Sequence, residues 1–431
     1  MVDIDDKRII FSGDLIYGPG KIWEFYSLAG KGYGQSFGGA VGSQINSLHV
    51  VKNLNPSILI PSHGLAMESP VGAINQLIAN LYTAMGNYHE RKILESPPSP
   101  DLPPWIRKTH TGPTYLLQAA DGTGFLIDVG WAPGLIDSLT AWGVADIDMI
   151  WASHYHFDHV EDLNTIVSRY GSDVYIQSQL TDLLENPVAY ELPCIYPYPI
   201  EVTRSLKDGE TFYWKGYKCT SFYFPSQTIY HAALLVEYEG SRVLFTGDSF
   251  YFGKPFDDCI FNRNLLGKDL GFERCYNMLL DMRPDVLVTA HTGANGYADW
   301  WAQQSLDNLN QRELIFSRLF PWSNVNFGMD PHWIRLYPYV SKVVPDETIR
   351  YEAVIYNHSN EAREARVELR APEGWTISQP ALSIVPAKSE GRIIIEAKTP
   401  SFPVDGRQVL GLAVRFGSWN LGEVAEAIAE Y

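Results

Sequence analysis

The sequence lacks any run of roughly 18 consecutive apolar residues, the length that a membrane-spanning helix requires, so we expect no membrane partner. Its start, MVDIDDKRII, is acidic and lacks the apolar core of an export signal. The sequence therefore predicts a soluble protein and does not indicate a compartment. Cysteine is also scarce, and no CxxC pair supports a zinc ribbon or a redox dithiol. The four cysteines are Cys194, Cys219, Cys259 and Cys275.

Basic residues are in deficit and are scattered along the chain rather than clustered. Lys and Arg number 33 against 50 Asp and Glu, which gives a formal net charge of −17. Because an acidic surface repels phosphate backbones, we expect no nucleic-acid partner. The length of 431 residues exceeds what one hydrophobic core usually supports, so two or three domains are expected.

The residue pattern changes along the chain and divides it into regions. Residues 105–325 alternate short apolar runs with helical stretches, which predicts a layered α/β domain. Residues 334–431 contain short alternating runs separated by Pro, Gly and Asn turns, which predict a small all-β sandwich. The Pro-rich stretch SPPSPDLPP, residues 96–104, predicts a linker between the α/β domain and a first region, residues 1–95.

The first region repeats part of the α/β region. Two ordered matches with similar spacing argue for a partial internal duplication: IIFSGDLIYGPGK (Ile9–Lys21) with VLFTGDSFYFGKP (Val243–Pro255), and VVKNLNPSILIPSHG (Val50–Gly64) with LLDMRPDVLVTAHTG (Leu279–Gly293). Asp14 then corresponds to Asp248, and His63 to His291. Two ligands cannot hold a dinuclear site, so we expect no function at Asp14 and His63. Because an isolated half-sheet leaves an unpaired edge, this half-domain should pack on the complete domain or on a second chain in a homo-oligomer, unless the chain start is truncated.

A cluster of metal-ligand residues, HYHFDH, directly follows the apolar run IDMIWAS, which we expect to be a buried strand. Residues two apart in an extended segment point the same way, so His154 and His156 can reach one metal. If the chain turns after Phe157, Asp158 and His159 can reach a second metal beside it. Neutral imidazole and carboxylate are ligands that zinc, iron and manganese accept. The cluster therefore predicts a metal site at the end of a strand.

Taken together, HYHFDH, FTGD (Phe245–Asp248) and TAH (Thr289–His291) resemble the motifs of the metallo-β-lactamase superfamily of hydrolases. The resemblance spans roughly Trp105 to Phe320 and implies an αββα sandwich with two metals at one edge of the sheets. It also implies that an acidic residue near FLIDVG braces the site. At the other end of the chain, APEGWTIS resembles immunoglobulin-like modules that are appended to many extracellular hydrolases.

The same resemblance implies a set of ligands for two divalent ions, with zinc first and iron or manganese as alternatives. His154 and His156 would bind the first metal, Asp248 would bridge the two, and the second metal would take Asp158, His159 and His291. The family commonly has a third histidine for the first metal, but PSQTIYHAALLVE places Gln227 at that position. His231 follows four residues later. We favour His231 over Gln227 because imidazole is the better ligand.

These residues predict a hydrolase that cleaves an ester, lactone, thioester or lactam bond of a small molecule through a metal-bridged hydroxide. Asp158 would orient the nucleophile or carry its proton. Two aromatic-rich segments, Asn186–Pro199 and Ser249–Phe272, are expected to wall the pocket, and the second offers basic side chains to an anionic group: Lys254, Arg263 and Lys268. The alternatives are a nuclease or phosphodiesterase of the same superfamily, a metal-free or an oxygen- or electron-handling relative, and a non-catalytic scaffold with a vestigial metal site.

Overall fold

The structure of the protein is a computed structural model, and it describes residues 1–25, 37–92, 95–110, 112–131, 133–250, 263–378, 381–402 and 406–431. Two compact units emerge from the contacts within the chain. The first comprises residues 1–185, 194–196 and 200–329. The second comprises residues 186–193, 197–199 and 330–431. Each unit is described by itself.

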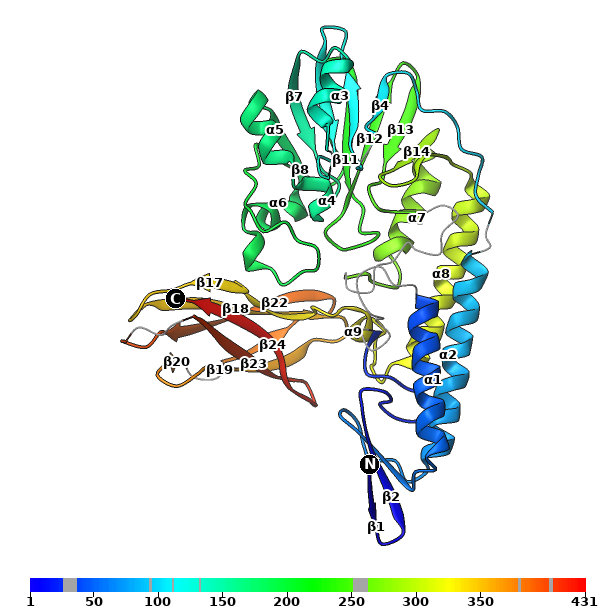
Figure 1. The fold of residues 1–431 in the computed structure, drawn as a ribbon, viewed down its shortest axis with the longest axis vertical. Helices are drawn as coiled ribbons and strands as arrows, with labels where there is room; N and C mark the ends of the chain where they lie inside the picture. Colours follow the sequence, from blue (N-terminus) through cyan, green and yellow to red (C-terminus); the bar gives the residue numbers. More distant parts are fainter. Residues whose placement is uncertain are drawn as a thin grey trace. The chain divides into compact units, whose positions relative to one another are not determined.

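Two six-stranded sheets form the centre of the first unit (Figure 1). One sheet contains, in order, β4 (Ile106–Lys108), β5 (Tyr115–Gln118), β6 (Thr123–Ile127), β7 (Asp146–Trp151), β8 (Asp173–Gln177) and β9 (Arg204–Leu206). The other contains β10 (Glu210–Trp214), β11 (Tyr217–Tyr223), β12 (Ala232–Tyr238), β13 (Ser241–Phe245), β14 (Val286–Thr289) and β15 (Gly293–Gly296). The strands of each sheet follow one another in chain order. Their largely apolar segments, such as MIW at the end of β7, where Met149, Ile150 and Trp151 are all buried, are explained by burial on both faces.

Helices cover the outer faces of these sheets (Figure 1). On the first sheet they are α3 (Leu135–Ala141), α5 (Leu163–Tyr170) and α6 (Ser178–Glu185), and the short α4 (Phe157–Val160) precedes α5. On the second sheet they are α7 (Gly271–Met282) and α8 (Asp299–Leu319), and the short α9 (Asn326–Met329) follows. The layers are therefore helix, sheet, sheet and helix, which confirms the α/β sandwich expected from the sequence.

The first region of the chain belongs to the same unit. It contains a three-stranded sheet of β1 (Val2–Ile4), β2 (Lys7–Gly13) and β3 (Ile58–Pro61), with helices α1 (Phe37–Asn53) and α2 (Pro70–Lys92). β2 pairs parallel with β3, as β13 pairs parallel with β14. This shared pattern of parallel strands, each pair followed by a long helix, supports the predicted duplication, which stays a prediction. Residues 96–104 contain neither a helix nor a strand.

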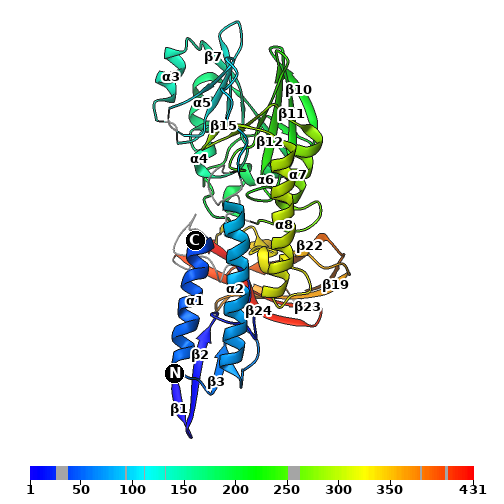
Figure 2. The same cartoon turned by 90° about the vertical axis from the view of Figure 1, so that its right-hand side faces the viewer.

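Helix α2 lies side by side with α8, as both views show (Figure 2). The Nδ2 atom of Asn87 donates to the carbonyl of Asn308 at 3.2 Å, and Nδ2 of Asn308 donates back to the carbonyl of Asn87 at 3.1 Å. One hydrophobic core contains Leu77 and Leu81 of α2 together with Leu309 of α8. The half-domain thus packs against α8, the last long helix of the sandwich, and shares its core.

The second unit consists of two β-sheets. The four-stranded sheet has the order β16 (Ile334–Tyr337), β18 (Thr348–Asn357), β22 (Ser389–Lys398) and β20 (Thr376–Ile377). The five-stranded sheet has the order β17 (Val340–Lys342), β24 (Trp419–Glu430), β23 (Arg407–Phe416), β19 (Arg363–Arg370) and β21 (Ala381–Val385). In β19, buried Ala365, Val367 and Leu369 alternate with exposed residues, as in a sheet with one face in a core. The immunoglobulin-like character of this unit stays a prediction.

Among the described residues, none of the helices combines the length and the apolar character needed to cross a membrane.

Candidate metal centre

The HYHFDH cluster lies where the chain leaves β7 and turns into α4. His156 has extended backbone angles (φ −61°, ψ 141°) and forms the N-cap of α4, so Asp158 and His159 fall in the first turn of this helix. The sequence predicts a turn after Phe157, and in the structure a short helix begins at Phe157. The imidazoles of His154, His156 and His159 are all buried. The extended segment after β7 thus provides the first two candidate ligands, and the first turn of α4 provides the other two.

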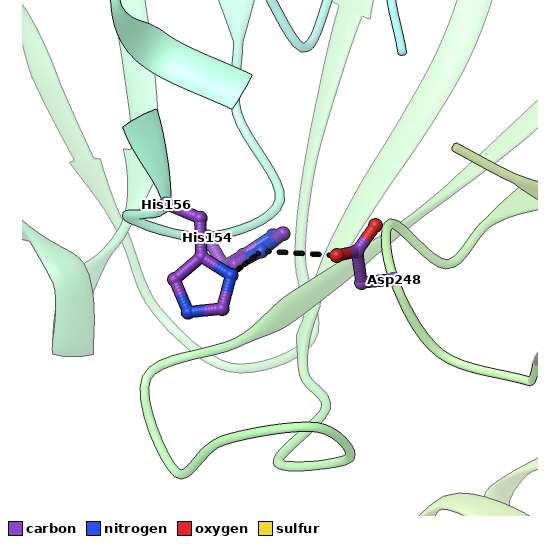
Figure 3. Close-up of side chains that lie close together, drawn as sticks. All are labelled: His154, His156 and Asp248. Atoms are coloured by element: carbon purple, nitrogen blue, oxygen red, sulfur yellow. Dashed lines mark hydrogen bonds and ion pairs between the residues drawn. The ribbon is translucent and has the colours of Figure 1, made fainter. Parts of the chain in front are cut away.

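Two groups of side chains are each close enough to hold a metal ion, since the candidate ligand atoms within each group lie within 4.8 Å of one another. The first group is His154, His156 and Asp248, which Figure 3 shows. The Nε2 atom of His154 lies 2.9 Å from Nδ1 of His156 and 3.7 Å from Oδ2 of Asp248. The histidines follow β7 of one sheet and the aspartate follows β13 of the other. The group therefore joins the two sheets at one edge of the sandwich.

The second group is Asp158, His159 and His291. The Nε2 atom of His291 lies 3.3 Å from Oδ2 of Asp158, and Nε2 of His159 lies 3.7 Å from the same oxygen. His291 follows β14, which is parallel to and paired with β13. Because parallel neighbours end at the same edge of a sheet, Asp248 and His291 come together.

Asp248 contacts both groups. Its Oδ1 lies 3.1 Å from Nε2 of His159 and 3.0 Å from Nε2 of His291, while Oδ2 faces His154. Gly247 before it has φ +50°, and a Cβ there would lie 2.4 Å from Oγ of Ser153. Glycine is therefore needed for β13 to end this close to the other sheet. One carboxylate oxygen is directed to each group, as a bridging ligand requires.

Gln227 and His231 both reach the first group. The backbone of His231 forms an isolated β-bridge with His154, and their ring centroids are 4.8 Å apart. The Nε2 atom of Gln227 donates to Oδ2 of Asp248 at 3.0 Å. Among the described residues, neither ring nitrogen of His231 has a hydrogen-bond partner, and Oε1 of Gln227 has none either. All three atoms are buried. Buried polar atoms of this kind are costly unless something binds them, so this donor set fits a metal ion.

Asp128 braces the cluster from behind. Its Oδ1 accepts from the backbone N–H of Ser153 at 2.7 Å, and its Oδ2 accepts from Oγ of Ser153 at 3.0 Å and lies 3.0 Å from Nδ1 of His159. A carboxylate on the second nitrogen of a ligand histidine fixes the ring and its tautomer. The acidic residue that the superfamily resemblance implies near FLIDVG is thus Asp128. Ser153, which the sequence did not single out, directly precedes the cluster and also lies 3.0 Å from Nδ1 of His154.

Replacing Asp128 with asparagine should weaken metal binding while leaving every candidate ligand in place. Outer carboxylates of this kind typically contribute roughly 10–100-fold to metal affinity. We therefore expect the Kd of the more weakly bound metal to rise by about this factor in Asp128→Asn, measured by competition with a chromophoric chelator. An unchanged Kd for both metals would show that Asp128 serves only to hold the turn.

The histidines of the cluster differ in their proton affinity. Burial lowers the pKa of His231 to about 3, and burial also holds the pKa of His154 well below its usual value. For His159, burial is outweighed by Asp248 and Asp128, which raise its pKa. For His291, burial is likewise outweighed, here by hydrogen bonds with Asp158 and Asp248, which raise its pKa to about 9. Without an ion, protons therefore reside on the histidines of the second group.

A metal ion must displace these protons, because only neutral imidazole coordinates. Since the pKa of His291 is raised to about 9 and that of His159 is also raised, the apparent metal affinity should rise as the pH increases from about 6 to about 9. The expected slope is about tenfold in Kd per pH unit for each proton released. Calorimetry in buffers of different ionisation enthalpy counts these protons. A Kd that does not change over this range would contradict the assignment.

The segments expected to wall the pocket are only partly placed at the site. Within Asn186–Pro199, the carbonyl of Cys194 accepts from the N–H of Phe157 at 2.9 Å, and Ile195 forms an isolated bridge with His156. Residues 186–193 and 197–199 of this segment belong to the second unit. In the other segment, residues 251–262, with Lys254 and Cys259, lie outside the described residues.

Two of the basic side chains expected to meet an anionic group are described. Arg263 is buried, and its guanidinium donates to the hydroxyl of Tyr230 at 3.5 Å. Lys268 is exposed. Arg263 is therefore engaged inside the unit, and a contact of either residue with an anionic group stays a prediction.

The family model described as the metallo-beta-lactamase superfamily matches residues 108–291. A hydroxyacylglutathione hydrolase of Serratia proteamaculans (strain 568) is 27% identical over 138 residues, which are 32% of this chain and 46% of that protein. The chain thus spans about half the length of this curated relative.

Similar solved structures include three metallo-beta-lactamase proteins. The Cronobacter sakazakii protein with the HARLDQ motif is 15% identical, with 51% of this chain and 95% of that chain covered and a TM-score of 0.39. A superfamily protein of Sulfolobus tokodaii is 18% identical, with 47% and 84% covered and a TM-score of 0.34. The enzyme of Novosphingobium pentaromativorans is 17% identical, with 47% and 87% covered and a TM-score of 0.37.

The family match begins at β4 and ends at His291, so it contains every candidate ligand described above. The order of the motifs along the chain and the two-sheet architecture agree with this match. Residues 108–291 of this chain form a domain of the metallo-beta-lactamase superfamily.

Proposed function

We propose that the protein is a metal-dependent hydrolase that cleaves an ester, lactone, thioester or lactam bond of a small molecule with two divalent ions. The observation that carries this proposal is the position of Asp248, whose two oxygens face two separate groups of candidate ligands. A mononuclear site would not need a second group. A structural site would not need a ligand set that reaches solvent at one end.

Six of the proposed ligands come from the two groups, and His231 is added because it forms a backbone bridge with His154 and its ring lies 4.8 Å from the ring of His154. His154, His156 and His231 would hold the first ion, Asp158, His159 and His291 the second, and Asp248 would bridge them. His231 is preferred to Gln227 because the amide of Gln227 already donates to Asp248, which leaves the glutamine as a partner of the bridging carboxylate. Zinc is the first choice for this set of imidazoles and carboxylates, and iron and manganese are the alternatives.

Two divalent ions, when bound, lower the pKa of a shared water toward about 7 and polarise the substrate oxygen. The residues of the chain would do the rest. Asp248 and Asp128 hold His159 in one orientation. Asp158, which is half-buried and 3.3 Å from His291, is placed to orient the nucleophile and to carry its proton to the leaving group.

A small-molecule substrate is favoured over a nucleic acid. The net charge of −17 opposes the approach of a phosphate backbone. The curated relative is named as a hydrolase of an acyl-glutathione, which supports acyl compounds as the first substrates to test. The bond that is cleaved and the identity of the substrate are part of the proposal.

The test is a hydrolysis assay on zinc-loaded protein with four substrate classes: an aryl ester, a lactone, an acyl thioester and a lactam. We expect turnover of at least one class, lost on chelation and restored by zinc. In His156→Ala it should fall by roughly 100-fold or more, since a ligand is removed. The matched control is His49→Ala, because His49 is an exposed residue of α1 outside the cluster. Absence of turnover in all four classes by protein that holds zinc, or equal activity of the two variants, would reject the proposal.

A further inference from the structure

The candidate ligands differ in their exposure, and this defines the side from which a substrate can arrive. The side chains of His154 and His159 are fully buried and that of Asp248 is 6% exposed, whereas Asp158 is 19% and His291 is 31% exposed. The cluster is therefore closed on the side of the first group and open on the side of Asp158 and His291. A substrate must reach the site past these two residues.

The turn that follows β6 lies directly beside this open side. The N–H of Val129 donates to the carbonyl of His159 at 2.7 Å, and the N–H of Asp162 donates to the carbonyl of Val129 at 3.2 Å. A Cβ on Gly130 would lie only 2.4 Å from the carbonyl carbon and oxygen of Asp158. The turn is thus packed against the peptide that carries two candidate ligands, with no room for a side chain at position 130.

Trp131 ends this turn in an unusual conformation. Its φ is +43°, in the left-handed region that a bulky residue rarely adopts, and its side chain is 63% exposed. The backbone N–H of Trp131 donates to Oε1 of Glu161 at 2.9 Å, which holds the residue in place. Strain of this kind persists where surrounding structure enforces it, and it concentrates at sites that bind ligands.

A second exposed aromatic residue, Phe157, is also linked to Glu161. Phe157, the first residue of α4, is 42% exposed, and the N–H of Glu161 donates to its carbonyl at 2.8 Å. Phe157 and Glu161 therefore lie one helical turn apart, and Glu161 in turn holds Trp131. Large apolar side chains that are exposed together beside a reactive site mark a binding surface more often than single exposed apolar side chains do.

We propose that Trp131 and Phe157 form an apolar subsite beside the second group of ligands, and that it binds an aromatic or long-chain acyl group of the substrate. This inference rests on the proposed hydrolase function and adds the substrate class. Aromatic faces bind apolar groups by area burial and by ring stacking. The carboxylates of Glu161 and Asp158 stand beside the subsite, so the group that it accepts carries no negative charge.

The experiment compares two thioesters with the same thiol and different acyl groups, acetyl and 3-phenylpropanoyl. For the wild-type protein we expect a higher kcat/KM with the phenylpropanoyl compound. In Trp131→Ala the ratio of the two kcat/KM values should fall by at least about tenfold, within the range known for apolar pockets. Trp131→Phe should restore most of the ratio. The matched control is Trp300→Ala, since Trp300 is an exposed tryptophan on α8, and here the ratio should not change. Equal losses on both thioesters in Trp131→Ala, with an unchanged ratio, would overturn the inference.

A binding arm separates failure of the subsite from failure of the hydrolase proposal. The probe is 4-phenylbutan-2-one, which has the same aromatic chain and no hydrolysable bond, followed by saturation-transfer NMR on zinc-loaded protein. If no substrate is hydrolysed but the ketone binds the wild-type and Trp300→Ala proteins and not Trp131→Ala, the subsite is supported and the hydrolase proposal fails. Equal binding by all three proteins, or binding by none, would reject the subsite.

Discussion

Replacing Asp248 with alanine should abolish hydrolysis and release bound metal. Asp248 contacts both groups of candidate ligands, with Oδ1 3.0 Å from His291 and 3.1 Å from His159, and Oδ2 facing His154. Its loss removes the bridge and leaves two groups of buried imidazoles without their shared negative charge. We expect kcat/KM to fall by roughly 10³-fold or more, together with the metal content of the purified protein.

The chain contains its own control for this substitution. Asp14 corresponds to Asp248 in the partial repeat and lies 3.8 Å from His63, the counterpart of His291. Both side chains are exposed, and the structure shows no second set of ligands beside them among the described residues. Asp14→Ala should therefore retain metal and activity. Retention of two metals by Asp248→Ala, or an equal loss in Asp14→Ala, would contradict the proposed role of Asp248.

Replacing His358 with alanine should strongly destabilise the second unit. Nε2 of His358 lies 3.0 Å from Oδ2 of Asp330, and both side chains are buried. Oδ1 of Asp330 also accepts from the N–H of His332 at 3.1 Å. The carboxylate therefore links His358 to the backbone near the start of the unit. Removing the imidazole takes this partner away from a buried carboxyl group. Such losses typically cost about 3–5 kcal/mol, which we expect as the decrease in the free energy of unfolding of this unit.

Urea denaturation, monitored with a probe in the second unit, measures this decrease in the free energy of unfolding. The contrasting pair is Arg407 and Glu430, which lie 2.9 Å apart on neighbouring strands with Arg407 exposed. Because exposed ion pairs contribute little, Arg407→Ala should change the free energy of unfolding by less than about 1 kcal/mol. Equal changes in the two variants would show that the buried pair has no special role.

The candidate ligands could be predicted from the sequence because their pattern is local. His154 and His156 are two residues apart after an apolar strand, and Asp158 and His159 follow where a helix begins. Strand and helix periodicity are short-range properties that residue spacing reports. Asp248 and His291 were predicted through the resemblance of FTGD and TAH to the superfamily motifs, and the structure brings them together because β13 and β14 pair in parallel. The alternation of apolar runs and helical stretches predicted a layered α/β domain, and the same resemblance implied the sandwich.

Other features depend on contacts between distant segments, which residue patterns do not encode. The contact of α2 with α8 joins Asn87 to Asn308, and the buried pair joins Asp330 to His358. Trp131 has a positive φ although it is neither glycine nor asparagine, so its residue type gives no signal of this conformation. Ligand chemistry favours His231 over Gln227, and the choice stays a prediction because both side chains lie beside the first group.

The most direct test of the metal centre is the anomalous scattering of zinc in crystals of the wild-type protein grown with zinc. We predict two peaks in the anomalous difference map, one within ligand distance of His154, His156 and His231, and one within ligand distance of Asp158, His159 and His291. Oxygens of Asp248 should lie between them. A protein with its fold intact and no zinc peak at these residues, or with a peak only at Asp14 and His63, would contradict the account.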